Sequence, residues 1–298
     1  MWTRIMLFVL TNIGVLVVLT TFMYILQNFF WINLWNGIYW LLIFSAIIGF
    51  AWSFISLAIS RWSAKRAYKI KPIQADEVSM LSGKERLVYD TVQSIAETHK
   101  IDMPEVGIYQ SNEPNAFATG PSKNKSLVAV SSGLLDTMDN GAVEWVVAHE
   151  MAHVLNGDMV TMTLLQWVVN TFVIFAAKLI ANIASNFVDE KMAGTVRFIT
   201  DIAFQMVLGF LASVITMKFS RYREFKADAG SAHYVGKEKM IAGLKALQAM
   251  QPTLQPVKAD SYSTMKIATG QPSGFKMLFA SHPPLDVRIK ALEDLIIR

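Results

Sequence analysis

Two histidines four residues apart, His149 and His153, lie in the apolar run Val146–Leu155, which contains neither glycine nor proline. Such a run is typical of a helix, on which residues four apart share one face, so both imidazoles can bind a single metal ion. Zinc takes nitrogen ligands of this kind, and a catalytic zinc keeps one coordination position free for water. Glu150 is placed to take a proton from that water. The alternative, two incidental histidines on an amphipathic helix, is disfavoured because the chain has only 5 His.

A catalytic zinc site needs a third protein ligand, and the longer pattern with a third histidine six residues further on is not present. Asp158 is a local candidate, although it lies just past a glycine that is expected to end the helix. Glu224 is the better candidate, with Asp228 four residues later on the same face of a predicted helix. One carboxylate can bind zinc while the other accepts the free ring N–H of a histidine ligand. Taken alone, this acid pair among Arg and Lys is also typical of a salt-bridged helix face.

The composition indicates a membrane protein with a smaller water-soluble part. Of 298 residues, 53% are hydrophobic and 17% charged, and the mean hydropathy is +0.36. Cysteine is absent, which excludes a disulfide framework and suits a reducing compartment. A net charge of +4 is compatible with binding to nucleic acid. We expect no nucleic-acid partner, because the basic residues cluster beside apolar runs and no binding motif accompanies them.

Four apolar runs are long enough to cross a bilayer, at about 5–26, 35–59, 159–188 and 198–219. The first lacks a cleavage site of small residues, so we interpret it as an anchor and not as a signal peptide. Tryptophans flank the second, as at a membrane interface. The last two runs, separated by a polar break at 189–197, have a competing interpretation as a buried hairpin in a large soluble domain.

Positive charge predicts the orientation of these runs, since Lys and Arg flank the cytoplasmic ends of membrane spans. Basic residues follow the second and fourth runs: Arg61, Lys65, Arg66, Lys69, Lys71, Lys218, Arg221, Arg223 and Lys226. Both termini and the soluble part are therefore expected in the cytoplasm. A pair of spans that returns to the same side would bring Glu224 back beside His149 and His153.

Between the second and third runs the sequence changes to a soluble α/β pattern. A helix is expected over Lys84–His99, and strands over Val106–Tyr109 and Leu127–Val130. The segment between the strands reads Asn115-Ala116-Phe117-Ala118-Thr119-Gly120. It is either an ordinary hairpin connection or an exposed edge that hydrogen-bonds an extended peptide.

The C-terminal part is expected to hold a helix within 231–250, a long polar loop over 251–274 and a last helix around Arg288. His233 falls on a different helical face from Glu224 and is a poor candidate ligand. If the metal site hydrolyses an amide bond, a basic residue can stabilise the oxyanion of the tetrahedral intermediate. The candidates for that role are His282, Arg223 and Arg288.

The combined motifs resemble those of the HtpX-type zinc peptidases of bacterial membranes, which are relatives of the CAAX prenyl proteases. The resemblance covers nearly the whole chain, including Asn115–Gly120, the His-Glu-x-x-His motif and the segments around Glu224 and His282. It implies that His149, His153 and Glu224 bind zinc and that Glu150 is the general base. It also implies that Asp228 holds one of the ligands in place and that a peptide binds at Asn115, Ala116, Phe117 and Ala118.

We therefore expect an α-helical membrane protein with four transmembrane helices and a cytoplasmic, mainly helical α+β zincin-like metallopeptidase domain. The expected parts are 1–71 with the first membrane hairpin, 72–158 with the metal helix, 159–219 with the second hairpin, and 220–298 with the third ligand. The oligomeric state is not predicted.

The expected function is zinc endopeptidase, with one Zn²⁺ per chain, in the bacterial inner membrane with both termini and the active site cytoplasmic. Its partners would be the bilayer and protein substrates, especially membrane proteins, and its role protein quality control and stress response. Two alternatives are an intramembrane-cleaving zinc protease and a non-enzymatic four-span protein with a structural metal.

Overall fold

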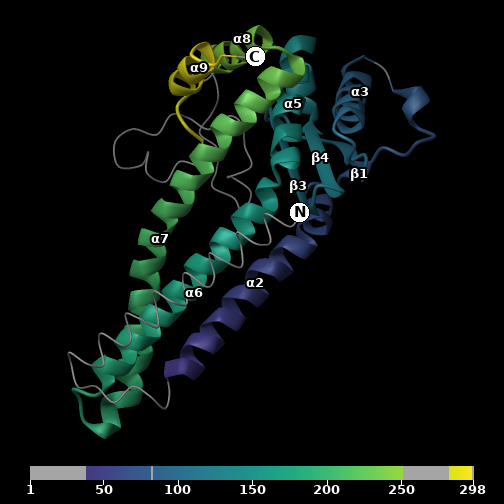
Figure 1. The fold of residues 1–298 in the computed structure, drawn as a ribbon. Helices are drawn as coiled ribbons and strands as arrows, with labels where there is room; N and C mark the ends of the chain where they lie inside the picture. Colours follow the sequence, from purple (N-terminus) through teal and green to yellow (C-terminus); the bar gives the residue numbers. More distant parts are fainter. Residues whose placement is uncertain (1–37, 82, 251–281, 297–298) are drawn as a thin grey trace. The chain divides into compact units, whose positions relative to one another are not determined.

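The computed structural model describes residues 38–81, 83–250 and 282–296 (Figure 1). The first predicted membrane run and the predicted loop over 251–274 lie outside the described residues. The chain divides into two compact units. Within the described residues, the first comprises 38–55 and 162–216, and the second 56–161, 217–250 and 282–296.

Three helices of the described chain are long and apolar enough to cross a membrane: α2 (Ile38–Ala67), α6 (Asp158–Ser185) and α7 (Glu190–Val235). They correspond to the second, third and fourth predicted runs. In the first unit the indole N–H of Trp167 donates to the carbonyl of Ala46 at 2.9 Å. Lys178 of α6 pairs with Asp201 of α7 at 2.9 Å.

Helix α7 is a single helix of 46 residues, longer than the sequence pattern indicated. The predicted polar break at 189–197 is mostly its first two turns, and only residues 186–189 separate it from α6. The helix also continues through Glu224 to Val235, so the helix predicted within 231–250 is divided at Gly236, whose φ is 100°. The charged residues that suggested boundaries are good helix formers, and no proline interrupts them.

The second unit contains a four-stranded mixed sheet in the order β1-β2-β4-β3. Strands β2 and β4 are parallel, whereas β3 is antiparallel to β4. The predicted helix over 84–99 and both predicted strands are confirmed. The elements of this part are β1 (Lys71–Pro72), a 3₁₀ turn (Val78–Met80), α3 (Gly83–Thr98), β2 (Glu105–Tyr109), β3 (Ala116–Ser122), β4 (Lys125–Ser131) and α4 (Ser132–Thr137).

Strand β3 is the segment for which a hairpin connection was one interpretation, and it lies at an edge of the described sheet. Gly120 has φ of 146°, and a Cβ there would collide with the carbonyl of Lys125 in the facing strand. Pro121 lacks an N–H, which an edge strand tolerates. Glycine and proline have low β propensity, so propensity alone does not predict this strand.

The core of the second unit surrounds α5 (Asn140–Asn156), which contacts α3, β3, β4 and α8 (Lys237–Met250) (Figure 1). Asp139 caps its N-terminus by accepting the N–H of Ala142 at 2.7 Å. Gly157 ends it in the left-handed conformation with φ of 66°. The predicted end of this helix at Gly157 is thereby confirmed, and α9 (Leu285–Glu293) matches the expected last helix.

Helix α8 packs directly on Trp145 of α5 at Gly243, where an added Cβ would overlap the buried indole ring. We expect Gly243→Ala to lower the stability of the protein by about 1–3 kcal/mol, because the two helices must separate to admit a methyl group. Thermal unfolding of the purified protein measures the effect. The matched control is Gly194→Ala in α7, where no atom lies within 4 Å of the added Cβ. Equal melting temperatures for both variants would contradict this packing.

Candidate active site

The two histidines of α5 face a carboxylate of α7. The potential ligand atoms of His149, His153 and Glu224 all lie within 4.8 Å of one another. Nε2 of His149 is 3.4 Å from Oε2 of Glu224, and Nε2 of His153 is 3.4 Å from Oε1. His153 and Glu224 are 71 residues apart in the sequence. They come together because the C-terminal part of α7, which carries Glu224, belongs to the second unit.

This donor set fits zinc in both spacing and chemistry. Ligand atoms about 2.0–2.1 Å from a tetrahedral zinc ion are roughly 3.4 Å apart, which is the separation between each imidazole Nε2 and one of the two carboxylate oxygens of Glu224. Two imidazole nitrogens and one carboxylate oxygen leave the fourth position open, as in catalytic sites. The three side chains can thus hold zinc with little rearrangement.

The other ring nitrogens of both histidines face carboxylates. Nδ1 of His153 is 2.6 Å from Oδ2 of Asp158, and Nδ1 of His149 is 3.0 Å from Oδ1 of Asp228. Contacts of this kind fix the ring orientation and leave Nε2 for the metal. Asp158, considered above as a metal ligand, contacts instead the nitrogen of His153 that faces away from Glu224.

Two residues near the C-terminus contact these carboxylates. Arg288 donates two hydrogen bonds to Asp228, at 2.8 and 2.6 Å. Nδ1 of His282 is 2.7 Å from Oε2 of Glu224. Arg288 is 4% exposed, so its charge is matched by Asp228 inside the protein and not by water. The C-terminal segment therefore holds the acidic residues that face the two imidazoles.

The electrostatics of this cluster favour a cation. Burial opposes the charged imidazole of His153, but hydrogen bonds to Asp158 and Glu224 outweigh it and raise the pKa to about 10. The pKa of His149 is also raised, because contacts with Asp228 and Glu224 outweigh burial. Protons and metal ions compete for the same nitrogens. The surplus of carboxylates accordingly suits a divalent cation bound between the rings.

Glu150 lies within α5 next to His149 and is 7% exposed. Burial raises the pKa of its carboxyl group, and the neighbouring imidazoles of His153 and His149 partly offset that effect. A carboxylate with a raised pKa is a stronger proton acceptor than an exposed one. The direction of this shift suits a residue that accepts a proton.

Comparison with known proteins agrees with this geometry. The sequence profile of peptidase family M48 matches residues 82–296. The chain belongs to peptidase family M48. A protein named protease HtpX homolog from Methylacidiphilum infernorum is 46% identical, with 99% of each chain covered. Another from Bacillus subtilis is 47% identical, covering 97% of this chain and 98% of the relative. The chain is accordingly a zinc metallopeptidase with an HExxH-type site at His149, His153 and Glu224.

A solved structure shares the fold of this M48 peptidase. The crystal structure of S. mikatae Ste24p matches with a TM-score of 0.58 and 16% identity. The match covers 96% of this chain and 66% of the Ste24p chain. At this identity the likeness establishes the fold alone.

The predicted peptide-binding segment lies beside α5, as the start of β3 (Figure 1). Asn115 is 3% exposed, and its side-chain amide donates to the hydroxyl of Tyr109 at 2.9 Å. Ala116 and Phe117 are also buried, whereas Ala118 is half-buried. The side chains of this segment are largely committed to the core, so a peptide would meet mainly the backbone edge of β3.

The three oxyanion candidates differ in how many of their side-chain nitrogens already form hydrogen bonds. Arg288 is bound through two nitrogens to Asp228. Arg223 donates from Nη2 to the hydroxyl of Ser220 at 3.2 Å, and its buried Nε has no hydrogen-bond partner among the described residues. The buried Nε2 of His282 likewise lacks such a partner in the described part of the chain. Arg223 and His282 thus retain ring or guanidinium nitrogens for a further contact.

Proposed function

We propose that this protein is a membrane-anchored zinc endopeptidase, with one zinc ion per chain, that cleaves membrane or membrane-associated proteins. The observation that carries the proposal is the meeting of His149, His153 and Glu224, with the buried Glu150 on the same helix. The membership of peptidase family M48 and the three helices long and apolar enough to cross a membrane in the described chain support it. A structural metal would need no adjacent buried base, so the non-enzymatic alternative is not favoured.

The proposed mechanism assigns one task to each residue. Zinc, when bound by His149, His153 and Glu224, supplies a Lewis acid that activates water and polarises the peptide carbonyl. Glu150 takes a proton from the attacking water and delivers it to the leaving amide nitrogen. Asp228 holds the ring of His149 and so keeps its Nε2 directed at the ligand cluster.

Further side chains keep the acidic groups in place. Asp158 holds the ring of His153, Arg288 orients Asp228 through two hydrogen bonds, and His282 orients Glu224. This assigns Arg288 a positioning role. Arg223 and His282 remain the candidates for stabilising the oxyanion, and a donor bond from Nε2 of His282 requires the imidazolium form, since Nδ1 faces Glu224.

Substrate binding is assigned to the edge of β3 that faces away from β4 in the described sheet, where an extended peptide would add a strand. Main-chain hydrogen bonds would then fix the peptide, while the buried Asn115, Ala116 and Phe117 keep the strand in place. Ala118, which is half-buried, is the member of the segment that a substrate side chain can contact. This mode accepts many sequences, as turnover of damaged or misassembled membrane proteins in quality control requires.

The function is tested by incubating the full-length protein in lipid nanodiscs with a panel of membrane proteins and of soluble folded proteins. We expect internal cleavage of membrane substrates, loss of cleavage after chelation, and recovery when one equivalent of zinc is added. Chelation removes the group that activates water, so residual activity should be at background. Cleavage that persists in metal-free protein would refute the zinc mechanism, and cleavage restricted to soluble proteins would refute the substrate class.

The proposed location is the bacterial inner membrane, with the active site on the cytoplasmic side. Helix α5 is not one of the three candidate membrane spans of the described chain, which favours cleavage outside the bilayer over intramembrane cleavage. Basic residues adjoin α2 and the Glu224 segment, as at cytoplasmic ends of spans. The first predicted span lies outside the described residues, so the position of the N-terminus rests on the sequence pattern alone.

The absence of cysteine allows a direct test of this topology. Single variants Asp286→Cys on α9 and Lys191→Cys at the start of α7 are both exposed and lie in different units. In inverted membrane vesicles a membrane-impermeant maleimide should label Asp286→Cys, and in right-side-out vesicles it should label Lys191→Cys. Labelling of both from one side would contradict the proposed crossing by α6 and α7. The cysteine-free protein is the control for background.

A further inference from the structure

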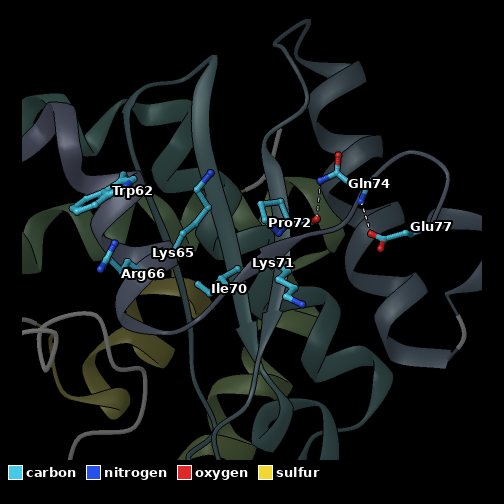
Figure 2. Close-up of a pocket in the computed structure, with 8 residues that line it drawn as sticks. All are labelled: Trp62, Lys65, Arg66, Ile70, Lys71, Pro72, Gln74 and Glu77. Carbon is cyan, nitrogen blue, oxygen red and sulfur yellow. Dashed lines mark hydrogen bonds between the residues drawn. The ribbon is translucent and has the colours of Figure 1, made fainter.

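An open groove lies in the second unit where α2 ends and the chain enters β1. Its volume is about 570 Å³. Figure 2 shows Trp62 and Arg66 at one end and Gln74 and Glu77 at the other. The complete lining is Trp62, Lys65, Arg66, Ile70, Lys71, Pro72, Gln74 and Glu77. None of these residues belongs to the peptidase site.

The cations of the groove differ in whether their charge is already paired. Lys65 is 3.0 Å from Glu105, which also binds Arg61 at 3.1 Å. By contrast, Arg66 and Lys71 form no ion pair with a carboxylate of the described residues. The groove therefore offers two cations to an external anion.

Trp62 orients one of these cations. The guanidinium of Arg66 lies 5.6 Å from the centre of the Trp62 ring, within the range of a cation–π contact. Trp62 as a whole is 59% exposed. An indole and a guanidinium held together in this way present a flat apolar surface and several N–H donors to the same ligand.

If the uncharged part of α2 crosses the bilayer, the groove comes at the depth of the lipid headgroups. Residues 38–60 of this helix carry no charge and span about 35 Å, slightly more than the roughly 30 Å hydrocarbon core. From Arg61 to Arg66 the helix rises about 8 Å, comparable with the headgroup layer on one side of a bilayer. An exposed tryptophan at this height is typical of a membrane interface.

We propose that this groove binds the headgroup of an anionic phospholipid, with Arg66 contacting the phosphate, Trp62 packing against the glycerol region and Lys71 adding positive charge further along the groove. Guanidinium and ammonium groups are the usual protein partners of phosphate. Glu77, whose carboxylate accepts the backbone N–H of Gln74 at 2.8 Å, places a negative charge at the far end. That charge repels an extended polyanion such as nucleic acid, so the groove suits a single anionic headgroup whose phosphate lies at the Arg66 end.

Lipid bound at this position would stabilise the connection between helix α2 and the sheet. Lys71 and Pro72 form β1, which pairs with β2. A headgroup attracted by both Arg66 and Lys71 would therefore stabilise the turn between α2 and the first strand. The lipid would serve as a structural ligand of the anchored peptidase and not as its substrate.

The test measures lipid binding to the full-length protein in detergent by native mass spectrometry, with phosphatidylglycerol and phosphatidylcholine as ligands. The variants are Arg66→Gln and Lys71→Gln. We expect each to weaken phosphatidylglycerol binding by about fivefold and the double variant by roughly thirtyfold, as estimated for a basic residue near a membrane surface. Phosphatidylcholine should bind weakly to all of them.

Lys69→Gln is the matched control, because Lys69 is exposed on the same segment but does not line the groove. It removes the same charge and should change affinity by less than twofold. Equal weakening by Lys69→Gln and Lys71→Gln would reduce the effect to general attraction by a basic segment and overturn the proposal. Competition by soluble glycerol phosphate at equal concentration would overturn the lipid assignment. Zinc content and proteolysis should stay unchanged in all variants, and their loss would show that the groove is not a separate site.

Discussion

The variant Glu150→Gln is expected to keep its zinc and to lose about 10²–10⁴-fold in kcat. Glutamine has almost the shape of glutamate, so the buried position on α5 remains filled and His149 and His153 remain in place. The amide, however, cannot accept a proton from the attacking water. The measurement pairs kcat on a cleaved membrane protein with the zinc content of the same sample.

The control for this change lies on the same helix. Glu144→Gln makes the same substitution at a partly exposed carboxylate that pairs with Lys239 at 2.7 Å. Exposed ion pairs contribute little to stability, so activity should be unchanged. Native activity in Glu150→Gln would rule out its role as the base. Loss of zinc from that variant would instead show that Glu150 supports the metal site.

Elements with a strong local pattern could be predicted from the sequence. Helix α3 follows from apolar residues at helical spacing, and the end of α5 from Gly157. Strands β2 and β4 are short apolar runs between polar residues. Their parallel pairing is a long-range property, and nothing local distinguishes it from a hairpin.

Other elements could not be predicted because the decisive interaction lies outside the segment. The first residues of α7 are polar, yet they continue the helix, since helix formation is compatible with exposed charge. Strand β3 contains Gly120 and Pro121, which argue against a strand in isolation. Pairing with β4 overrides that preference, and an edge position makes the missing N–H harmless.

The site shows the same division between local and distant information. The spacing of His149 and His153 determines their common face, so this pair follows from the sequence alone. Asp158 carried a signal, since it lies just beyond the end of the metal helix, but its partner nitrogen could not be predicted. The contacts of His282 with Glu224 and of Arg288 with Asp228 join residues 58 and 60 positions apart. Helical or strand spacing does not predict contacts between residues so far apart. The sequence therefore indicated these residues as candidates but not which residues they contact.

Removing the third ligand should have the largest effect on metal binding. Glu224→Ala takes away the carboxylate that both imidazoles face at 3.4 Å, leaving two neutral nitrogens to hold a divalent cation. We expect zinc stoichiometry to fall from one per chain to near zero under conditions that saturate the native protein. Equilibrium dialysis followed by elemental analysis measures it directly.

Two further variants separate loss of a ligand from loss of structure. Glu224→Gln keeps an acceptor for Nδ1 of His282, so it should retain the thermal stability of the metal-free protein while still losing most zinc. Asp228→Asn leaves the three ligands intact, but it weakens the contact with His149 and removes the negative charge that pairs with Arg288, so its zinc affinity should fall by about 10–100-fold. A larger loss of zinc binding in the Glu224 variants than in Asp228→Asn distinguishes a metal ligand from a residue that holds a ligand in place. Unchanged zinc stoichiometry in Glu224→Ala would mean that α7 does not supply the third ligand, and the proposed site would have to be abandoned.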